Sequence, residues 1–276
     1  MADGPQDLDT GTDELLATLD RGVLTVTLNR PAARNAYSMP LLDALGELLA
    51  AAEDDERVRV VVVTGAGAGF CAGGDVKVMA RGESIFGPAD DVEARRTRHA
   101  AAQRATTVRL AQFAKPTLAL VNGPAVGAGL ALALACDLRW AAESAVLRTG
   151  FVRAGLAGDF GCTWLLTRLV GPARATELLF TSAALTAEAA RAEGLLTGVV
   201  PDGELPARGA AVARTLAETS PLALRAVKDN VARASTQDLA SCADAEVDWH
   251  VRLVETPEHR AAVAALSTPR PAGPYS

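Results

Sequence analysis

The segment Arg57–Asp75 reads RVRVVVVTGAGAGFCAGGD and carries the clearest structural signal in the chain. Its first half, Arg57–Thr64, is a run rich in β-branched residues, which is typical of a strand buried on both faces of a parallel sheet. Glycines then form a loop, and Asp75 is expected to begin the next helix. The segment therefore predicts a strand–loop–helix unit of an α/β fold.

A second glycine-rich junction follows the predicted strand Thr117–Val121. The turn Asn122–Gly129 leads into a helix of small residues, Leu130–Ala135. Each junction would aim unpaired backbone N–H groups outward from a helix N-terminus, and small residues let another group approach the backbone. If the two converge, they form an oxyanion hole; separately, each is a tight turn. Neither matches GxGxxG in a Rossmann context, so a dinucleotide site is not indicated.

The remaining patterns divide the 276 residues into three parts. We expect residues 1–12 to be a mobile N-terminal tail, residues 13–200 an α/β core and residues 201–276 a C-terminal helical oligomerisation region. The other expected elements are a hairpin of 15–19 and 23–28, a helix starting near Ser38, a loop at 81–92, a helix at 92–113, strands near 138–141 and 145–147, helices from Cys162 onward, a strand at 198–200, and helices at 203–219, 222–234, 237–254 and 257–266.

Charge and composition exclude several classes of protein. The 27 basic and 33 acidic residues give a net charge of −6, which argues against nucleic-acid binding, and a hydrophobic content of 49% is too high for global disorder. The N-terminus has no secretory signal, and the longest apolar stretch, 117–138, is broken by turn residues. The four cysteines show no CxxC spacing. We therefore expect a soluble, cytoplasmic protein with reduced thiols and no metal site, binding neither nucleic acid nor membrane.

Taken together, the motifs resemble the crotonase superfamily, the enoyl-CoA hydratases and isomerases. The resemblance extends from about residue 14 to 270. The matching pieces are Leu28–Pro31 with Asn35-Ala36, Phe70–Asp75, Lys115-Pro116 through Gly123, Ala135–Leu138, and Leu165–Gly171.

That resemblance implies a spiral of ββα units followed by a C-terminal helical region that trimerises, giving a homotrimer or a hexamer of two trimers. It implies an acyl-CoA thioester as substrate, with coenzyme A as part of that substrate and no separate cofactor. The family's two oxyanion donors correspond to the backbone N–H groups of Gly74 and Ala128. Loss of one such donor typically costs about 2.7–4 kcal/mol of transition-state stabilisation.

The chain departs from the family at both catalytic glutamates of the hydratases. The corresponding positions hold Ala131 and Phe151, neither of which can transfer a proton. The two-glutamate hydratase mechanism and the single-glutamate isomerase mechanism are therefore both excluded by this alignment.

One carboxylate, Asp159, remains in the matching stretch. Some superfamily members carry a catalytic aspartate here: the proton shuttle of the epoxyphenylacetyl-CoA isomerases and the nucleophile of the 4-chlorobenzoyl-CoA dehalogenases. A pocket lined by Ala131, Phe151, Phe160 and Trp164 would desolvate Asp159 and favour acid–base work. Alternatively, Asp159 is the N-cap of a helix that begins near Gly161.

The dehalogenase interpretation is less favoured, because that group also uses a histidine base and a tryptophan. An ungapped count places Arg104 at the histidine position and Phe151 at the tryptophan position, with His99 one turn away.

The resemblance also implies contacts with coenzyme A. Each arginine among the candidate residues could equally be a solvated surface residue that does not bind phosphate, and Asp75 could be only a helix N-cap. The candidate residues are Arg30, Arg34, Ala72, Asp75 and Arg270.

Three functions follow as hypotheses. The first is an acyl-CoA isomerase or related lyase that uses Asp159. The second is an enoyl-CoA hydratase in the broad sense, and the third is a non-catalytic acyl-CoA-binding paralogue.

Overall fold

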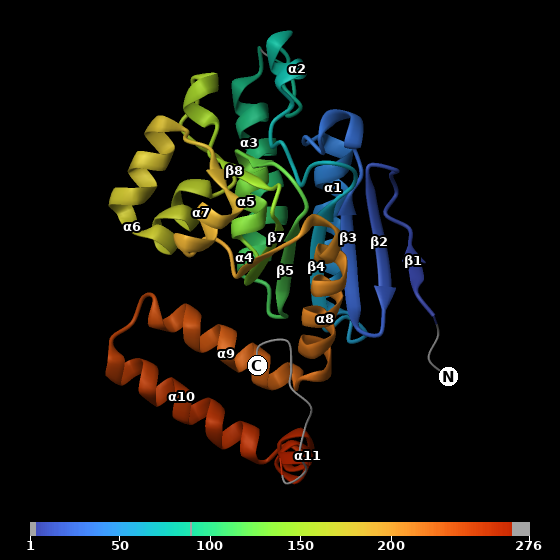
Figure 1. The fold of residues 1–276 in the computed structure, drawn as a ribbon, viewed down its shortest axis with the longest axis vertical. Helices are drawn as coiled ribbons and strands as arrows, with labels where there is room; N and C mark the ends of the chain where they lie inside the picture. The colour runs from blue at the N-terminus through green and yellow to red at the C-terminus, as the bar shows by residue number, and fades with distance from the viewer. Residues whose placement is uncertain (1–3, 89, 267–276) are drawn as a thin grey trace.

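The computed structural model describes residues 4–88 and 90–266 and has a mixed α/β architecture (Figure 1). Its main sheet has seven strands in the order β1-β2-β3-β4-β5-β7-β10. From β3 onward the strands run parallel, whereas β1 and β2 are antiparallel additions at one edge. The strands are β1 Gln6–Leu8, β2 Leu15–Asp20, β3 Val23–Leu28, β4 Val60–Gly65, β5 Thr117–Val121, β7 Leu138–Ala142 and β10 Gly198–Val200.

The strand β4 is the centre of this sheet, as its sequence predicts. Val61 and Val63 face one hydrophobic core, while Val60 and Val62 face a second core on the opposite side of the sheet. All four side chains are buried. The predicted hairpin is also confirmed, because β2 pairs with β3 in a register that sets Leu15 opposite Leu28.

A second, smaller sheet lies beside the main one, in the order β6-β8-β9. It contains β6 Ala125–Val126, β8 Val146–Arg148 and β9 Leu185–Thr186. A bridge between Cys71 and Ala125 ties the first glycine-rich junction to the second.

Helices cover both faces of the main sheet (Figure 1). The predicted start of α1 is confirmed, since the Ser38 hydroxyl accepts a hydrogen bond from the N–H of Leu41. The helices are α1 Met39–Asp54, α2 Val76–Ala80, α3 Val92–Gln103, α4 Arg109–Ala111, α5 Ala128–Leu134, α6 Cys162–Thr181, α7 Ala187–Ala192, α8 Leu205–Glu218, α9 Pro221–Ala234, α10 Leu239–Val254 and α11 Pro257–Leu266.

The helix expected at 92–113 is interrupted by a π-helical segment, Arg104–Val108. Within it, the Thr106 hydroxyl donates to the carbonyl of Ala102 at 2.7 Å. The segment packs closely on α1, because a Cβ built on Gly46 would lie 3.0 Å from the Cβ of Ala105. Such π-bulges occur often near functional sites, and this one directly follows α3.

Two of the expected boundaries differ from the structure. Within the segment 1–12, Gln6–Leu8 forms β1, because the edge of β2 offers unpaired backbone groups to a polar segment. At the other end, α8 belongs to the body: Leu205, Val212 and Ala213 complete the second core. The helices that stand apart are α9, α10 and α11, below the body in Figure 1.

The pair α9–α10 joins the body through Lys228. Its ammonium lies 2.7 Å from the Asp137 carboxylate, which also accepts hydrogen bonds from the backbone and hydroxyl of Thr117. Within the described part of the chain, no helix combines the length and apolarity needed to cross a membrane.

Candidate active site

The two glycine-rich junctions meet at one end of the main sheet. The N–H of Val126 donates to the carbonyl of Cys71 at 2.9 Å. Gly73 has φ of +74°, and a Cβ built there would lie 2.5 Å from the Val126 oxygen and 2.9 Å from the Ala128 nitrogen. Only glycine allows this approach, so the pair of loops depends on Gly73.

Two backbone N–H groups at this meeting point remain available. Ala128 is the first residue of α5, where an N–H has no partner within the helix, and Gly127 before it provides no side-chain cap. Gly74 follows Gly73 directly. Within residues 4–88 and 90–266, neither the Gly74 nor the Ala128 N–H donates a hydrogen bond to the protein. Both N–H groups can therefore donate hydrogen bonds to an anionic oxygen of a bound ligand.

The positions of the family's two glutamates lie close to Ala128. Ala131, one turn further along α5, is completely buried. Phe151 is also buried, and its ring carbon Cε1 would lie 3.6 Å from a Cβ built on Gly127. An alanine and a phenylalanine therefore occupy the wall beside the Ala128 donor.

Asp159 does not cap a helix. The residue that precedes α6 is Gly161, and no side chain caps this helix. Instead, Asp159 Oδ2 lies 3.5 Å from His99 Nε2, while Oδ1 is buried without a hydrogen-bond partner in the described part of the chain. The capping interpretation is therefore wrong.

The sequence count placed His99 one turn away from the site, but the structure brings it to Asp159. Its ring stacks on Phe86 with centroids 4.0 Å apart and planes at 7°, and it lies 5.5 Å from the ring of Phe160. Of the three histidines in the chain, His99 is the only one before residue 250, in the part predicted to form the body. Its place as the one histidine in the predicted body is the sequence signal that could have identified His99 as a candidate site residue.

Tyr37 contacts both glycine-rich junctions and the residue after Asp159. Its N–H donates to the carbonyl of Gly73 at 2.7 Å, its hydroxyl donates to the carbonyl of Ala128 at 3.2 Å, and its ring lies 5.0 Å from Phe160. Complete burial raises the pKa of Tyr37 well above its usual value, with the charges of Cys71 and Asp159 as smaller contributions. The Tyr37 hydroxyl therefore stays neutral beside the two junctions.

The buried cysteines near the site do not provide a nucleophile. Burial raises the pKa of the Cys71 thiol and of the Cys162 thiol to about 12. Since a thiolate is the reactive form, both stay inert at neutral pH.

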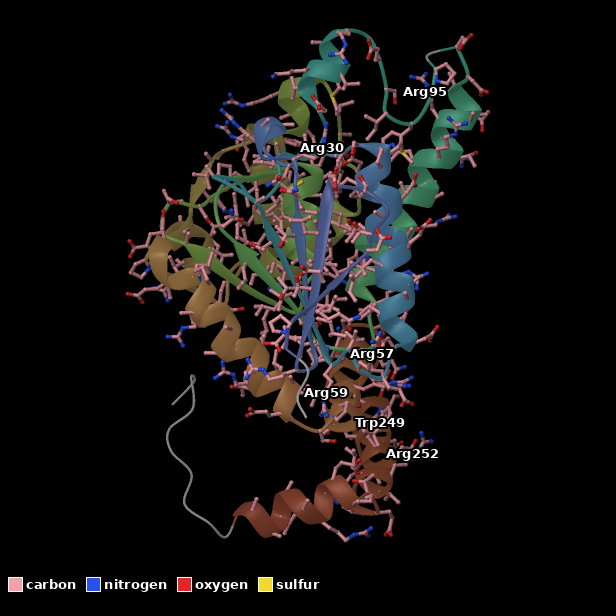
Figure 2. The ribbon with its side chains drawn as sticks, turned by 90° about the vertical axis from the view of Figure 1, so that its right-hand side faces the viewer. Arg30, Arg57, Arg59, Arg95, Trp249 and Arg252 are labelled. Carbon is pink, nitrogen blue, oxygen red and sulfur yellow. The ribbon has the colours of Figure 1, made fainter. Side chains whose placement is uncertain are left out.

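The predicted coenzyme A residues separate into two groups. Arg30 is occupied: its guanidinium pairs with Glu14 at 3.2 Å and with Asp75 at 3.7 Å, at the end of the sheet near α2 (Figure 2). Asp75 also caps α2 by accepting from the N–H groups of Lys77 and Val78.

Arg34 is the more available cation. It is exposed, and its carbonyl accepts a hydrogen bond from the N–H of Ala72 at 3.0 Å, so these two predicted residues lie together. Trp164 is 58% exposed, with the Arg168 guanidinium 4.2 Å from its ring centroid. Arg270 lies outside the described residues.

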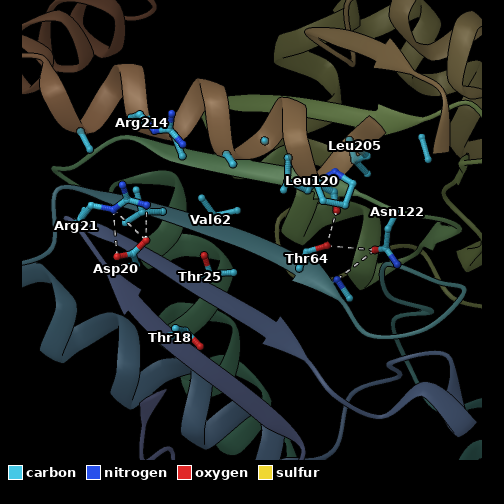
Figure 3. Close-up of a pocket in the computed structure, with 18 of the residues that line it drawn as sticks. Thr18, Asp20, Arg21, Thr25, Val62, Thr64, Leu120, Asn122, Leu205 and Arg214 are labelled. Carbon is cyan, nitrogen blue, oxygen red and sulfur yellow. Dashed lines mark hydrogen bonds and ion pairs between the residues drawn. The ribbon is translucent and has the colours of Figure 1, made fainter. Parts of the chain in front are cut away.

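A cavity of about 590 Å³ lies elsewhere, between α8 and the opposite face of the sheet (Figure 3). Its walls include Val62, Leu120 and Leu205, which belong to the second core. None of the predicted site residues lines it. The predicted site residues and this cavity are therefore separate regions of the molecule.

Comparison with known proteins identifies the family of the chain. The family model for enoyl-CoA hydratase/isomerase matches residues 18–269. The chain belongs to this family. It therefore has the crotonase fold, and members of the superfamily act on acyl-CoA thioesters.

Individual relatives span nearly the whole chain or most of it. The chain is 36% identical over 256 residues to 1,2-epoxyphenylacetyl-CoA isomerase of Escherichia coli, covering 93% of this chain and 96% of that protein. It is 35% identical to 4-chlorobenzoyl coenzyme A dehalogenase-2 of Arthrobacter, covering 86% and 84%. An enoyl-CoA hydratase-like protein from Thermobifida fusca, solved in complex with acetoacetyl-CoA, is 32% identical with a TM-score of 0.81, covering 88% and 96%.

The close approach at Gly73 can be tested against a glycine of the same backbone conformation. Gly82 has φ of +71° and no atom near its Cβ position, so Gly82→Ala adds only backbone strain, about 1–2 kcal/mol. Gly73→Ala adds the same strain and a clash with Val126 and Ala128. We expect it to lower the free energy of unfolding by about 2 kcal/mol more than Gly82→Ala, as overpacking does. Equal losses in denaturant unfolding would contradict the close packing of the two junctions.

Proposed function

We propose that the protein is an acyl-CoA isomerase, or a related lyase, in which Asp159 moves a proton beside an oxyanion hole formed by the Gly74 and Ala128 N–H groups. The observation that carries this proposal is a single carboxylate with one unpartnered buried oxygen, on the residue before Phe160, whose ring packs on Tyr37 beside two free backbone donors. The similarity to 1,2-epoxyphenylacetyl-CoA isomerase supports an isomerase over a hydratase.

The proposed reaction begins when the thioester oxygen binds between the two N–H groups. Asp159, as the carboxylate, removes a proton from the acyl chain, and the resulting negative charge develops on the thioester oxygen as an enolate. The two donors stabilise that charge because they are already oriented and need no rearrangement. Asp159 then returns the proton to a different carbon, so the double bond moves and no atom is gained or lost.

Coenzyme A would bind near Arg34 and Ala72. The exposed Arg34 can meet a phosphate without breaking an ion pair, whereas Arg30 would have to leave Glu14 and Asp75. Small residues at Ala72 and Gly73 leave room for the adjoining part of the ligand. In this proposal coenzyme A is part of the thioester substrate, and the reaction uses no separate cofactor.

A dehalogenase-type displacement is the second candidate, and the His99–Asp159 contact favours it. In that reaction the Asp159 carboxylate would displace halide from an aromatic acyl group, and His99 would take the proton from the water that hydrolyses the resulting ester. Release of halide from 4-chlorobenzoyl-CoA distinguishes this reaction from isomerisation, which releases none.

Replacing the carboxylate tests the isomerase directly. With a panel of enoyl-CoA esters in D₂O, we expect the wild type to introduce deuterium at the α- or γ-carbon. Asp159→Asn should slow this exchange by at least about 10²-fold, the usual contribution of an acid–base group. The matched control is Glu143→Gln, which alters an exposed carboxylate after β7 and should leave the rate unchanged. Full exchange by Asp159→Asn would refute the assignment.

We also propose that the chain assembles through α9 and α10 as a homotrimer or a hexamer. The support is a set of exposed apolar side chains on these two helices, which would be costly to leave in water. They are Leu222, Val227, Val231, Leu239, Val247 and Val251.

The mass in solution tests this assembly. Light scattering should give three or six copies of the 28.5 kDa chain. Val231→Asp places a charge on the apolar face of α9 and should shift the mass toward the single chain, whereas Val92→Asp, at an exposed valine on α3, should not. A single-chain mass for the wild type would contradict the proposal.

A further inference from the structure

We propose that His99 is a positioning residue for Asp159 and that α3 is the platform that holds the carboxylate against the substrate. This inference deepens the isomerase proposed above and rests on it. It follows from the arrangement of α3 and the loop before α6.

One face of α3 holds two consecutive residues of that loop. His99 and Gln103 are four residues apart, so they project from the same side of the helix. His99 Nε2 faces Asp159 Oδ2 at 3.5 Å, and Gln103 Oε1 accepts a hydrogen bond from the Phe160 N–H at 3.1 Å. The side chain of residue 159 and the backbone of residue 160 are thus fixed by the same helix.

The backbone beside Asp159 is held in an unfavourable conformation. Phe160 has φ of +47°, which is rare for a bulky residue because its Cβ crowds the backbone. The conformation persists because the buried Phe160 ring packs on both Tyr37 and His99 and because Gln103 holds its N–H. Strain of this kind is found where a residue must be aimed, and here it aims Asp159.

The imidazole ring is fixed as firmly as the loop. Stacking on Phe86 restricts rotation of the imidazole ring, and the contact with the Phe160 ring restricts it further. The Nε2 atom of His99 faces Asp159 Oδ2 at 3.5 Å and makes no hydrogen bond in the described part of the chain. The other oxygen, Oδ1, has no hydrogen-bond partner there either. Asp159 thus turns Oδ2 toward His99, and Oδ1 is left to act on the substrate.

The test compares two variants of His99 in the deuterium-exchange assay. His99→Leu removes the contact with Oδ2, and we expect kcat to fall by about 10–100-fold, as for partners that orient a catalytic group, with little change in KM. His99→Gln retains an N–H donor and should recover part of kcat. His250→Leu, on the exposed face of α10, is the matched control and should match the wild type.

The outcomes separate this inference from the function on which it rests. If Asp159→Asn is inactive but His99→Leu keeps the wild-type kcat, the role of His99 is refuted and the isomerase stands. If Asp159→Asn is fully active, both are refuted. A kcat for His99→Gln no higher than that of His99→Leu would overturn the positioning role of the N–H donor. Melting temperatures of both His99 variants show whether a lost rate reflects unfolding, and His99→Gln keeps the test decisive if His99→Leu fails to fold.

Discussion

The site depends on the close approach of two backbone segments, Gly73 and Val126–Ala128. A side chain at residue 73 would overlap both a carbonyl oxygen and the Ala128 nitrogen, so the contact exists only because glycine is there. This approach brings the backbone just before Gly74 against the Ala128 nitrogen. It also explains the alanine-rich sequence around them, since larger residues would separate the loops or fill the space that a thioester needs.

The proposed acid–base group is positioned by a different part of the chain. Asp159 lies on the loop before α6, next to α3, whose His99 faces its carboxylate and whose Gln103 accepts from the N–H of Phe160. Ala131 and Phe151 stand where the resemblance places the family's glutamates. In the account proposed here, the two backbone donors are kept and the proton-handling group lies on this loop instead.

Much of the fold was accessible from the sequence because its signals are local. The β-branched run of β4, the Ser38 cap of α1 and the paired runs of β2 and β3 each reflect neighbouring residues. The π-helical segment and the strand Gln6–Leu8 were missed, because they depend on packing against α1 and on the free edge of β2. His99 was set aside for a similar reason: an ungapped count fixes a position along a helix, whereas the contact with Asp159 depends on how α3 lies on the loop.

The most direct measurement is a crystal structure of this protein with acetoacetyl-CoA. We predict that the thioester oxygen lies about 2.7–3.1 Å from both the Gly74 and the Ala128 nitrogen, with Asp159 Oδ1 facing the carbon between the two carbonyl groups. A thioester oxygen that contacts neither nitrogen, or a ligand bound in the cavity beneath α8, would contradict the proposed site.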